Sequence, residues 1–360
     1  MVLGSCITQF MPETGENKDI LVVEGLITDQ LGTNIVKLSR SLPLAGKKII
    51  KPVRGYNVTI SDDEGNSHLL SEKEPGTYIT DSATFRGIVG RKYKLIIRAN
   101  NIGAPNYTYE SLPMEMKPVP PIDSIYFEKV IIETGTAWKK NGCQIYLDTH
   151  DPENKCKYYR WDYTETWEFR LPYYVTNNRC WISERSNVIN IKSTNVLSAS
   201  NIVQYPLKYI SPETDRLSVK YSLLVNQYSL NEDEYDFWSK IQNISQDVGS
   251  LYDITPASIP GNIFCIEDPG ETVLGYFSVS SVNSKRIHIK ESFLGLVNLY
   301  YQCPTDTVHS LEEIEDVLNT KYWIIEDGSY DIPPYWVITN KKGCADCTVR
   351  GTNIKPSWWE

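Results

Sequence analysis

The sequence lacks several features that would indicate common functions. No run approaches the ~18 consecutive apolar residues of a membrane-spanning helix, so any membrane link must come through the N-terminus. No block of Lys or Arg occurs and the formal net charge is -9, which argues against a nucleic-acid partner because phosphate binding needs a basic surface. No GxSxG elbow, phosphate-binding glycine loop, HExxH pair or dinucleotide fingerprint is found, so we expect a protein that is not an enzyme.

Metal and redox ligands are also scarce. The four histidines are isolated, and the CxxC pair of Cys344 and Cys347 has no two further ligands at the spacing of a zinc site. A thioredoxin-like role for this pair would need a βαβ context, which the surrounding sequence does not provide. We therefore expect no metal and no cofactor, and we interpret the CxxC pair as part of a structural disulfide.

Cysteine, by contrast, is frequent. Eight cysteines in the chain fit an oxidising compartment, where thiols form disulfides. If Cys6 is set aside, seven candidates for disulfide bonds remain: Cys143, Cys156, Cys180, Cys265, Cys303, Cys344 and Cys347. Because seven is odd, at least one thiol is expected to be left over.

The chain opens with MVLGSC. An apolar residue, two small residues and a cysteine form the pattern that a lipoprotein signal peptidase cuts. The apolar stretch of ~7–15 residues that a signal peptide needs is missing upstream. Two interpretations follow: the sequence starts late and Cys6 is lipidated, or Cys6 is an ordinary cysteine near the terminus.

Short apolar segments separated by turn residues dominate the first third of the chain. Their spacing over residues 19–112 is that of an all-β sandwich. The segment LPMEMKPVPPI follows, and its prolines favour an extended connector over residues 113–122. We take this connector as a domain boundary.

Residues 123–360 are again rich in strands. Their apolar segments predict a large antiparallel sheet that closes toward a barrel or a sandwich. Capping boxes at Ser229–Glu232 and Ser310–Glu313 predict helices near residues 230–248 and 310–319. The predicted fold class is therefore mainly β with a short helical insert.

The segment KYYRWDYTETWEFRLPYYV is the most distinctive binding candidate. As a strand it places alternate residues on opposite faces, so one face can pack in the core while the other meets solvent. Flat rings beside an arginine suit a sugar ring or an extended peptide, through stacking and cation–π contact. The candidate ligand-binding residues are Tyr158, Arg160, Trp167, Tyr173 and Tyr174. The alternative is that most of these rings pack in the core and across strands.

A catalytic alternative rests on acidic residues. Asp148 and Asp151 flank His150 in LDTHDPENK, and two carboxylates that meet in a cleft could act as in a glycosidase. Acidic residues around a proline are also typical of a solvated turn, which is the interpretation that we favour.

Several motifs occur together in an order that resembles a known family. They include KDILVVEGLITD, VKLSRS, GYNVTISDDEGN, PGTYIT, YKLIIRA, PIDSIYF, YYRWDY, LNEDEYDFWSKI, PGNI, VLGYFSVSSV and the tail CADCTVRGTNIKPSWW. No single motif is diagnostic. The set follows Cys6, runs through nearly the whole chain, and resembles the Bacteroidota outer-membrane lipoproteins catalogued as domain of unknown function 4249.

The resemblance implies a fold, a location and a class of function. It implies an immunoglobulin-like sandwich over residues 19–112, a β-rich C-terminal domain, and a tether over residues 1–18 that is lipidated at Cys6. It also implies an outer-membrane lipoprotein that faces the cell exterior and serves a TonB-dependent, SusC/SusD-like importer of peptides or glycans as a non-enzymatic accessory. The rivals are a surface hydrolase that trims its substrate before uptake and a purely structural partner of the importer.

Overall fold

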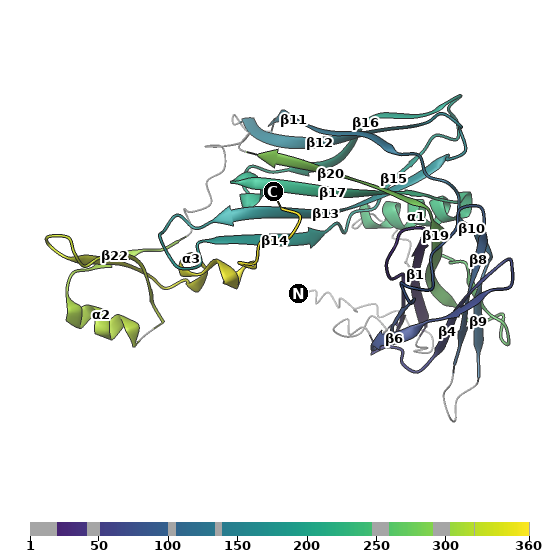
Figure 1. Cartoon of the computed structure of the whole chain (residues 1–360), viewed down its shortest axis with the longest axis horizontal. Coiled ribbons are helices and arrows are strands. Elements are labelled where there is room, and N and C mark those ends of the chain that lie inside the picture. The colour runs from purple at the N-terminus through teal and green to yellow at the C-terminus, as the bar shows by residue number, and fades with distance from the viewer. Residues whose placement is uncertain are drawn as a thin grey trace, which may run out of the picture. The chain divides into compact units, whose positions relative to one another are not determined.

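A computed structural model of the chain describes residues 20–41, 51–99, 106–133, 139–246, 259–290, 303–319 and 321–359. The described residues divide into two compact units (Figure 1). The first unit comes from Met1–Lys117 and Asn231–Ser281, and the second from Pro118–Leu230 and Val282–Glu360. Strands dominate both units, which confirms the predicted mainly β class.

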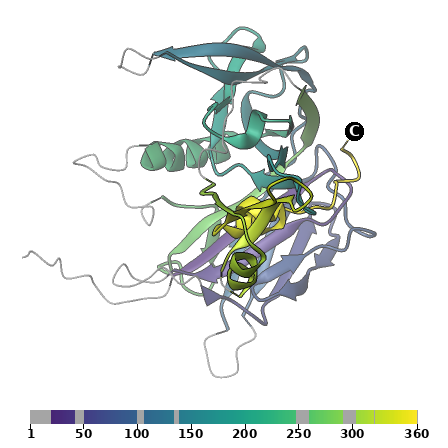
Figure 2. The same ribbon diagram turned by 90° about the vertical axis from the view of Figure 1, so that its left-hand side faces the viewer.

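The first unit is a sandwich. Its strands are β1 (Leu21–Thr28), β2 (Ile35–Arg40), β3 (Lys51–Pro52), β4 (Asn57–Asp62), β5 (Ser67–Leu69), β6 (Ser71–Glu74), β7 (Thr77–Ile79), β8 (Lys92–Arg98), β9 (Thr108–Ser111), β10 (Met114–Glu115), β18 (Ile263–Cys265) and β19 (Val273–Ser280). One sheet has the order β19-β1-β2-β7-β6, with β3 beside β2. The other has the order β18-β9-β8-β4-β5, with β10 beside β8. Figure 2 shows the strands of this unit, purple to blue with β19 in green, after a turn of 90° from Figure 1.

Alternation along the strands builds the core of this sandwich. In β1 the side chains of Leu21, Val23 and Ile27 are fully buried, while those between them are partly or fully exposed. In β8 the residues Leu95 and Ile97 do the same from the other sheet. A period of two in a half-buried strand has this result, so the apolar segments of the sequence predict the inward faces correctly.

Strand β19 changes the domain boundaries that the sequence predicts. It pairs in parallel with β1 along the full length of both strands, and Phe277 and Val279 are fully buried in the core of the first unit. The sequence-based division assigns Asn231–Ser281 to the C-terminal domain, whereas these residues complete both sheets of the first unit. The difference has a physical cause, because strand pairing depends on exposed backbone edges and not on closeness along the chain.

A glycine allows this pairing. Gly275 has φ +91, and a Cβ there would lie 2.0 Å from the carbonyl oxygen of Val23 in β1. Only glycine combines this left-handed conformation with so close an approach of two backbones.

Helix α1 (Glu232–Gln246) lies where the first capping box predicts a helix. Phe237 is buried in the core of the first unit, and Trp238, Ile241 and Ile244 pack against that core. The apolar side chains of α1 therefore share the face that packs on this core. None of the described helices is long and apolar enough to cross a membrane.

The second unit contains two larger antiparallel sheets. Their strands are β11 (Ile122–Glu133), β12 (Lys139–Asp151), β13 (Tyr158–Arg170), β14 (Arg179–Arg185), β15 (Asn190–Ser193), β16 (Ser200–Ile210), β17 (Lys220–Ser229) and β20 (Val282–Lys290). One sheet has the order β11-β12-β16 and the other β14-β13-β17-β20, with β15 beside β13. Among the described strands both sheets stay open, so the sandwich alternative holds and the barrel alternative does not.

A third, smaller sheet belongs to the end of the chain. Its elements are β21 (Asp306–Val308), α2 (Leu311–Leu318), β22 (Trp323–Gly328) and β23 (Tyr335–Thr339), followed by α3 (Lys342–Ala345) and the short helix η4 (Cys347–Val349). We call residues 303–341 the C-terminal module. Helix α2 confirms the second predicted helix, and its capping contact is present, since the Glu313 amide donates to Ser310 Oγ at 3.2 Å.

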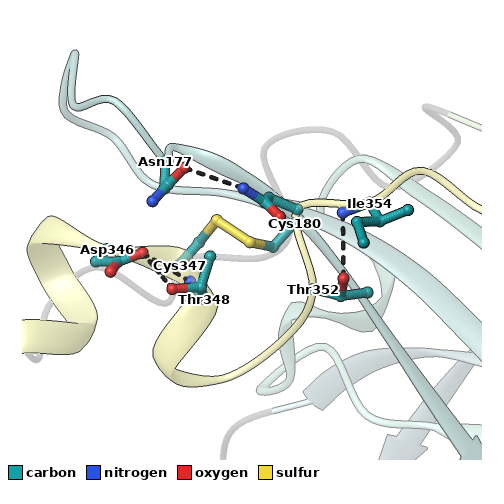
Figure 3. The surroundings of a disulfide bond; sticks show 8 residues. Asn177, Cys180, Asp346, Cys347, Thr348, Thr352 and Ile354 are labelled. Atoms are coloured by element: carbon teal, nitrogen blue, oxygen red, sulfur yellow. Dashed lines mark hydrogen bonds between the residues drawn. A yellow bond between two sulfur atoms is a disulfide. The ribbon is translucent and has the colours of Figure 1, made fainter.

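Two disulfides attach this module. Cys303 is bonded to Cys344, and Cys347 is bonded to Cys180 of β14 (Figure 3). Beside the second bond, the Cys347 amide donates to the carbonyl oxygen of Asn177 at 2.9 Å. The CxxC pair is therefore structural, as predicted, but its two cysteines bond to different segments.

The remaining disulfide candidates are thiols. Cys143, Cys156 and Cys265 are buried and take part in neither disulfide, so the prediction that included them is corrected. Burial raises the pKa of the Cys143 thiol to about 12, and such a cysteine packs as a small apolar side chain. Cys6 and the other residues of the predicted tether, up to residue 18, lie outside the described residues.

Candidate functional site

The second unit carries a cleft of about 370 Å³, which we call the polar cleft. Its charged lining comes from β13, β14, β16 and the short helix η1 (Asp215–Leu217). The lining residues used below are Tyr163, Glu165, Glu184, Arg185, Ser186, Lys208 and Arg216. All of these side chains belong to one unit, so the geometry of the cleft does not depend on the first unit.

Glu165 is at the base of the polar cleft. It is only 4% exposed and sits in the inward-facing series of β13, between the buried rings of Tyr163 and Trp167. A buried carboxylate is costly unless hydrogen bonds and opposite charges compensate for the lost water. The surroundings of Glu165 provide that compensation.

Four donor contacts converge on this carboxylate. Arg216 donates from Nη2 to Oε1 at 3.1 Å and from Nε to Oε2 at 3.2 Å. The hydroxyl of Tyr221 donates to Oε2 at 3.0 Å, and Lys208 Nζ donates to Oε1 at 3.4 Å. An ionised carboxylate has about four lone-pair sites, so the acceptor capacity of Glu165 is filled.

Arg216 links the base of the polar cleft to its rim. Its Nη2 also donates to Glu184 at 2.6 Å, and its guanidinium lies over the ring of Trp167, 4.3 Å from the centroid. Burial alone would lower the pKa of Arg216, but the hydrogen bonds to Glu165 raise it above its ordinary value. The guanidinium is therefore a fixed positive charge.

Tyr163 of the cleft and Tyr221, the fully buried partner of Glu165, are neutral. Burial, reinforced by the charge of Glu165, raises the pKa of Tyr163 to about 12 and that of Tyr221 well above its ordinary value. Tyr221 can therefore donate to Glu165 at any physiological pH.

Lys208, Arg185 and Ser186 supply further donors. The ammonium of Lys208 uses one donor on Glu165 and lies 5.3 Å from the ring centroid of Tyr163. Arg185 is exposed, and Ser186 Oγ accepts from the Tyr163 amide at 3.1 Å, which leaves its hydroxyl proton to donate elsewhere. The polar cleft can therefore bind an acceptor group.

The five predicted ligand-binding residues do not meet at one surface. Trp167 is buried on the inward face of β13, where it underlies Arg216, and Tyr158 is buried on the opposite face. Arg160 lies over the ring of Tyr228, at 4.8 Å. In the loop after β13, Tyr173 is half-buried and Tyr174 is fully exposed. Core packing thus accounts for the buried rings, and no exposed platform combines the five.

The acidic turn that offered a catalytic alternative is a hydrogen-bonded turn. Asp151 accepts from the amides of Lys155 and Cys156 at 2.6 and 2.7 Å, which stabilises the connection between β12 and β13. Asp148 accepts from the Gln204 amide at 2.7 Å. These contacts are those of structural side chains. Within the described residues no group of three or more His, Cys, Asp or Glu is arranged to hold a metal ion.

Sequence reasoning missed Glu165, Lys208 and Arg216. One signal was available, because Glu165 falls in the inward-facing series of a strand that is otherwise aromatic on that face. A charge at such a position predicts either a functional site or a buried ion pair. Its partners Lys208 and Arg216 are distant in sequence and carry no local signal.

The fold and the polar cleft define a two-unit, mainly β protein whose second unit has a charged cleft and a disulfide-attached C-terminal module. The chain belongs to the family described as domain of unknown function (DUF4249), whose sequence profile matches residues 7–286. The match confirms the family that the motifs indicate over most of the chain, and the tail CADCTVRGTNIKPSWW lies beyond the matched residues. A comparison with curated proteins finds no match.

Proposed function

We propose that this protein is a non-enzymatic, lipid-anchored outer-membrane protein that faces the cell exterior and serves a SusC/SusD-like nutrient importer. In this proposal the polar cleft captures peptide or glycan cargo for the transporter. The family membership, the cysteine pattern of an oxidising compartment and the cleft itself support it.

The saturation of Glu165 is the observation that carries the proposal. A carboxylate that accepts from Arg216, Tyr221 and Lys208 has no remaining site at which to take a proton from a substrate or a water. Glu165 instead fixes the positions of Arg216 and Lys208 in the polar cleft, as expected of a residue that supports a binding site.

The surface hydrolase is the rival that this geometry disfavours. Glu165 and Glu184 both accept from Nη2 of Arg216, so two carboxylates do meet in the polar cleft. A glycosidase needs one of its two carboxyls protonated as the general acid. In the polar cleft both carboxyls instead accept hydrogen bonds from one guanidinium, which is the contact of an acceptor and not of a proton donor.

The anchor is tested by the variant Cys6→Ala in the native cell. We expect the variant to fold normally and to leave the outer-membrane fraction, because the acyl chains that hold the protein there attach at this thiol. Fractionation followed by immunoblotting measures the distribution, with Cys265→Ala as the matched control that stays with the membrane. A Cys6→Ala protein that still sediments with the outer membrane contradicts the anchor.

The importer link is tested by purification of the native protein from detergent-solubilised outer membranes. A TonB-dependent barrel and its lipoprotein lid are expected to copurify. Calorimetry of the soluble protein against peptides and oligosaccharides then separates the capture role from the purely structural rival, which predicts copurification without ligand binding.

A further inference from the structure

We infer that the polar cleft and the adjacent edge of β14 together bind an extended acidic peptide, with a carboxylate of the peptide held in the cleft. The inference rests on the proposed function and names the class of its cargo. Three observations support it: the charge of the cleft, the absence of exposed rings in it, and the open backbone edge beside it.

The polar cleft is positive on a protein that is negative overall. Three cations, Arg185, Lys208 and Arg216, face two carboxylates, Glu165 and Glu184, while the chain carries a formal net charge of -9. Arg216 satisfies both carboxylates. Lys208 and Arg185 are therefore the charges available to an incoming anion.

Lys208 is placed to reach such an anion. Its side chain is 21% exposed, and its ammonium has three donors, of which Glu165 occupies one. The buried Glu165 fixes the position of the ammonium before any ligand arrives. A preorganised donor loses little freedom on binding, which favours affinity.

The rings of the cleft do not favour a sugar. Tyr163 is 4% exposed, and Trp167 is covered by the guanidinium of Arg216. Stacking of a sugar needs an accessible ring face, which neither residue offers. The volume of about 370 Å³ is at the lower end for small-molecule sites and suits one side chain with its carboxylate.

The open edge of β14 favours a peptide. Strand β14 is the edge strand of the sheet β14-β13-β17-β20 (Figure 1). Its residue Glu184 pairs with Glu165 of β13 and lies at the rim of the polar cleft. The tail closes part of this edge, since Trp181 and Thr352 exchange backbone hydrogen bonds at 2.8 and 2.9 Å.

Beyond that bridge the described residues leave this edge of β14 unpaired. The backbone N–H and C=O groups of an antiparallel strand alternate in direction from one residue to the next. The backbone groups of Ser183 and Arg185 therefore point the same way as those of Trp181, away from β13. In the described part of the chain no segment pairs with Ser183 or Arg185 on that side. An extended peptide can add there as a further strand, with every second side chain on the face that carries the cleft.

Fluorescence anisotropy with two labelled, end-capped heptapeptides tests the inference. One has a central Glu and the other a Gln at the same position, and both have alternating Val residues. We expect the Glu peptide to bind at least about tenfold more tightly, with a difference that shrinks as salt is raised. A Glu peptide with N-methyl groups at alternate amides loses the strand pairing and is expected to bind about tenfold more weakly than its parent.

Protein variants locate the site. Lys208→Met is expected to weaken the Glu peptide about tenfold and to leave the Gln peptide unchanged. Lys192→Met, on the exposed side of β15, is the matched control and keeps full affinity. Near-ultraviolet circular dichroism verifies that Lys208→Met folds, and the N-methylated peptide tests the edge without any change to the protein.

The outcomes separate this inference from the proposed function. Equal binding of the Glu and Gln peptides, or equal effects of Lys208→Met and Lys192→Met, overturns the carboxylate assignment. Binding of a trigalacturonate probe in place of both peptides overturns the peptide assignment and leaves the capture role intact. Absence of any ligand, together with loss of copurification with the importer, overturns the proposed function itself.

Discussion

Each face of β13 carries one buried glutamate. Glu165 is held on the inward face, and Glu168 is held on the outward face, where it is 2% exposed. Arg179 donates to Glu168 at 2.8 Å, Arg170 at 3.0 Å, and the indole of Trp359 in the C-terminal tail at 3.3 Å. Glu168 therefore connects the sheet to the end of the chain.

Glu168 makes stability depend on pH. Burial alone would raise its pKa, but the hydrogen bonds from Arg179 and Arg170 outweigh burial and lower the pKa below the ordinary value of 4.5. A lowered pKa in the folded state stabilises the protein above the unfolded value, and the stabilisation is lost as pH falls through the folded value. Glu168→Gln is expected to lower the free energy of unfolding by about 1.5–3 kcal/mol at neutral pH.

Urea unfolding at pH 7 and at successively lower pH measures this effect. The difference between Glu168→Gln and the natural protein should shrink as pH falls from 4.5, the ordinary value, toward the lowered pKa of the folded state, because the unfolded chain takes up a proton on Glu168 before the folded protein does. Below the folded value both proteins carry a neutral side chain, and the difference should be smallest there. Glu153→Gln, at an exposed turn of the same unit, is the control. A difference that is independent of pH would show that packing, and not the charge, is responsible.

The alternation of residues along a strand predicts which face of the sheet each side chain occupies, but it does not predict the hydrogen-bond partners of that side chain. The sequence of β13 indicates correctly that Tyr159, Trp161 and Tyr163 share one face, and this face is the buried one. It does not indicate that Arg216 reaches Glu165, because the two are 51 residues apart. Side-chain networks depend on the packing of distant strands, for which one strand carries no information.

At the scale of elements, the CxxC pair attaches the C-terminal module to the rest of its unit. Cys344 closes the module on Cys303, across a sequence separation of 41, and Cys347 joins the next turn to Cys180, across 167. The helices were predictable because capping is local, as the contact of Glu313 with Ser310 shows. The disulfide partners were not, because spacing along the chain does not determine which cysteines meet.

The two disulfides are expected to act differently when removed. Cys180→Ser with Cys347→Ser should lower the free energy of unfolding of the second unit by about 2–4 kcal/mol, since a long loop in the unfolded chain is released. Cys303→Ser with Cys344→Ser should mainly expose the C-terminal module to proteolysis. Thermal unfolding and limited trypsin digestion, each with and without reductant, distinguish the two.

Reductant provides the internal control for this comparison. It should destabilise the natural protein and have a smaller further effect on each double variant, because one bond is already absent. The thiols Cys143, Cys156 and Cys265 do not contribute to the difference, since they take part in neither bond. An unfolding temperature of the natural protein that reductant leaves unchanged would contradict a stabilising role for both bonds.

At the scale of the whole molecule, the chain passes from the first unit to the second, returns, and leaves again. The proline-rich connector at 113–122 marks the first passage correctly, because prolines disrupt regular pairing locally. The return at Asn231 and the second departure after Ser281 carry no such signal. A single boundary is therefore what the sequence supports, although the structure has three.

This connectivity predicts that the first unit cannot fold from its N-terminal segment alone. A fragment of residues 19–117 lacks β18, β19 and α1. The backbone edges of β1 and β9 then lose their partner strands, and the core loses Phe277. We expect this fragment to be unfolded or aggregated, because an open apolar edge is a site of association. A second fragment, in which residues 231–281 follow residue 117 through a glycine-serine linker, restores every strand of the unit. Dispersed amide signals in the NMR spectrum of the linked fragment, and their absence in the shorter one, would establish that the returning segment is required. Equally dispersed amide signals from both fragments would mean that the sandwich folds without β18, β19 and α1.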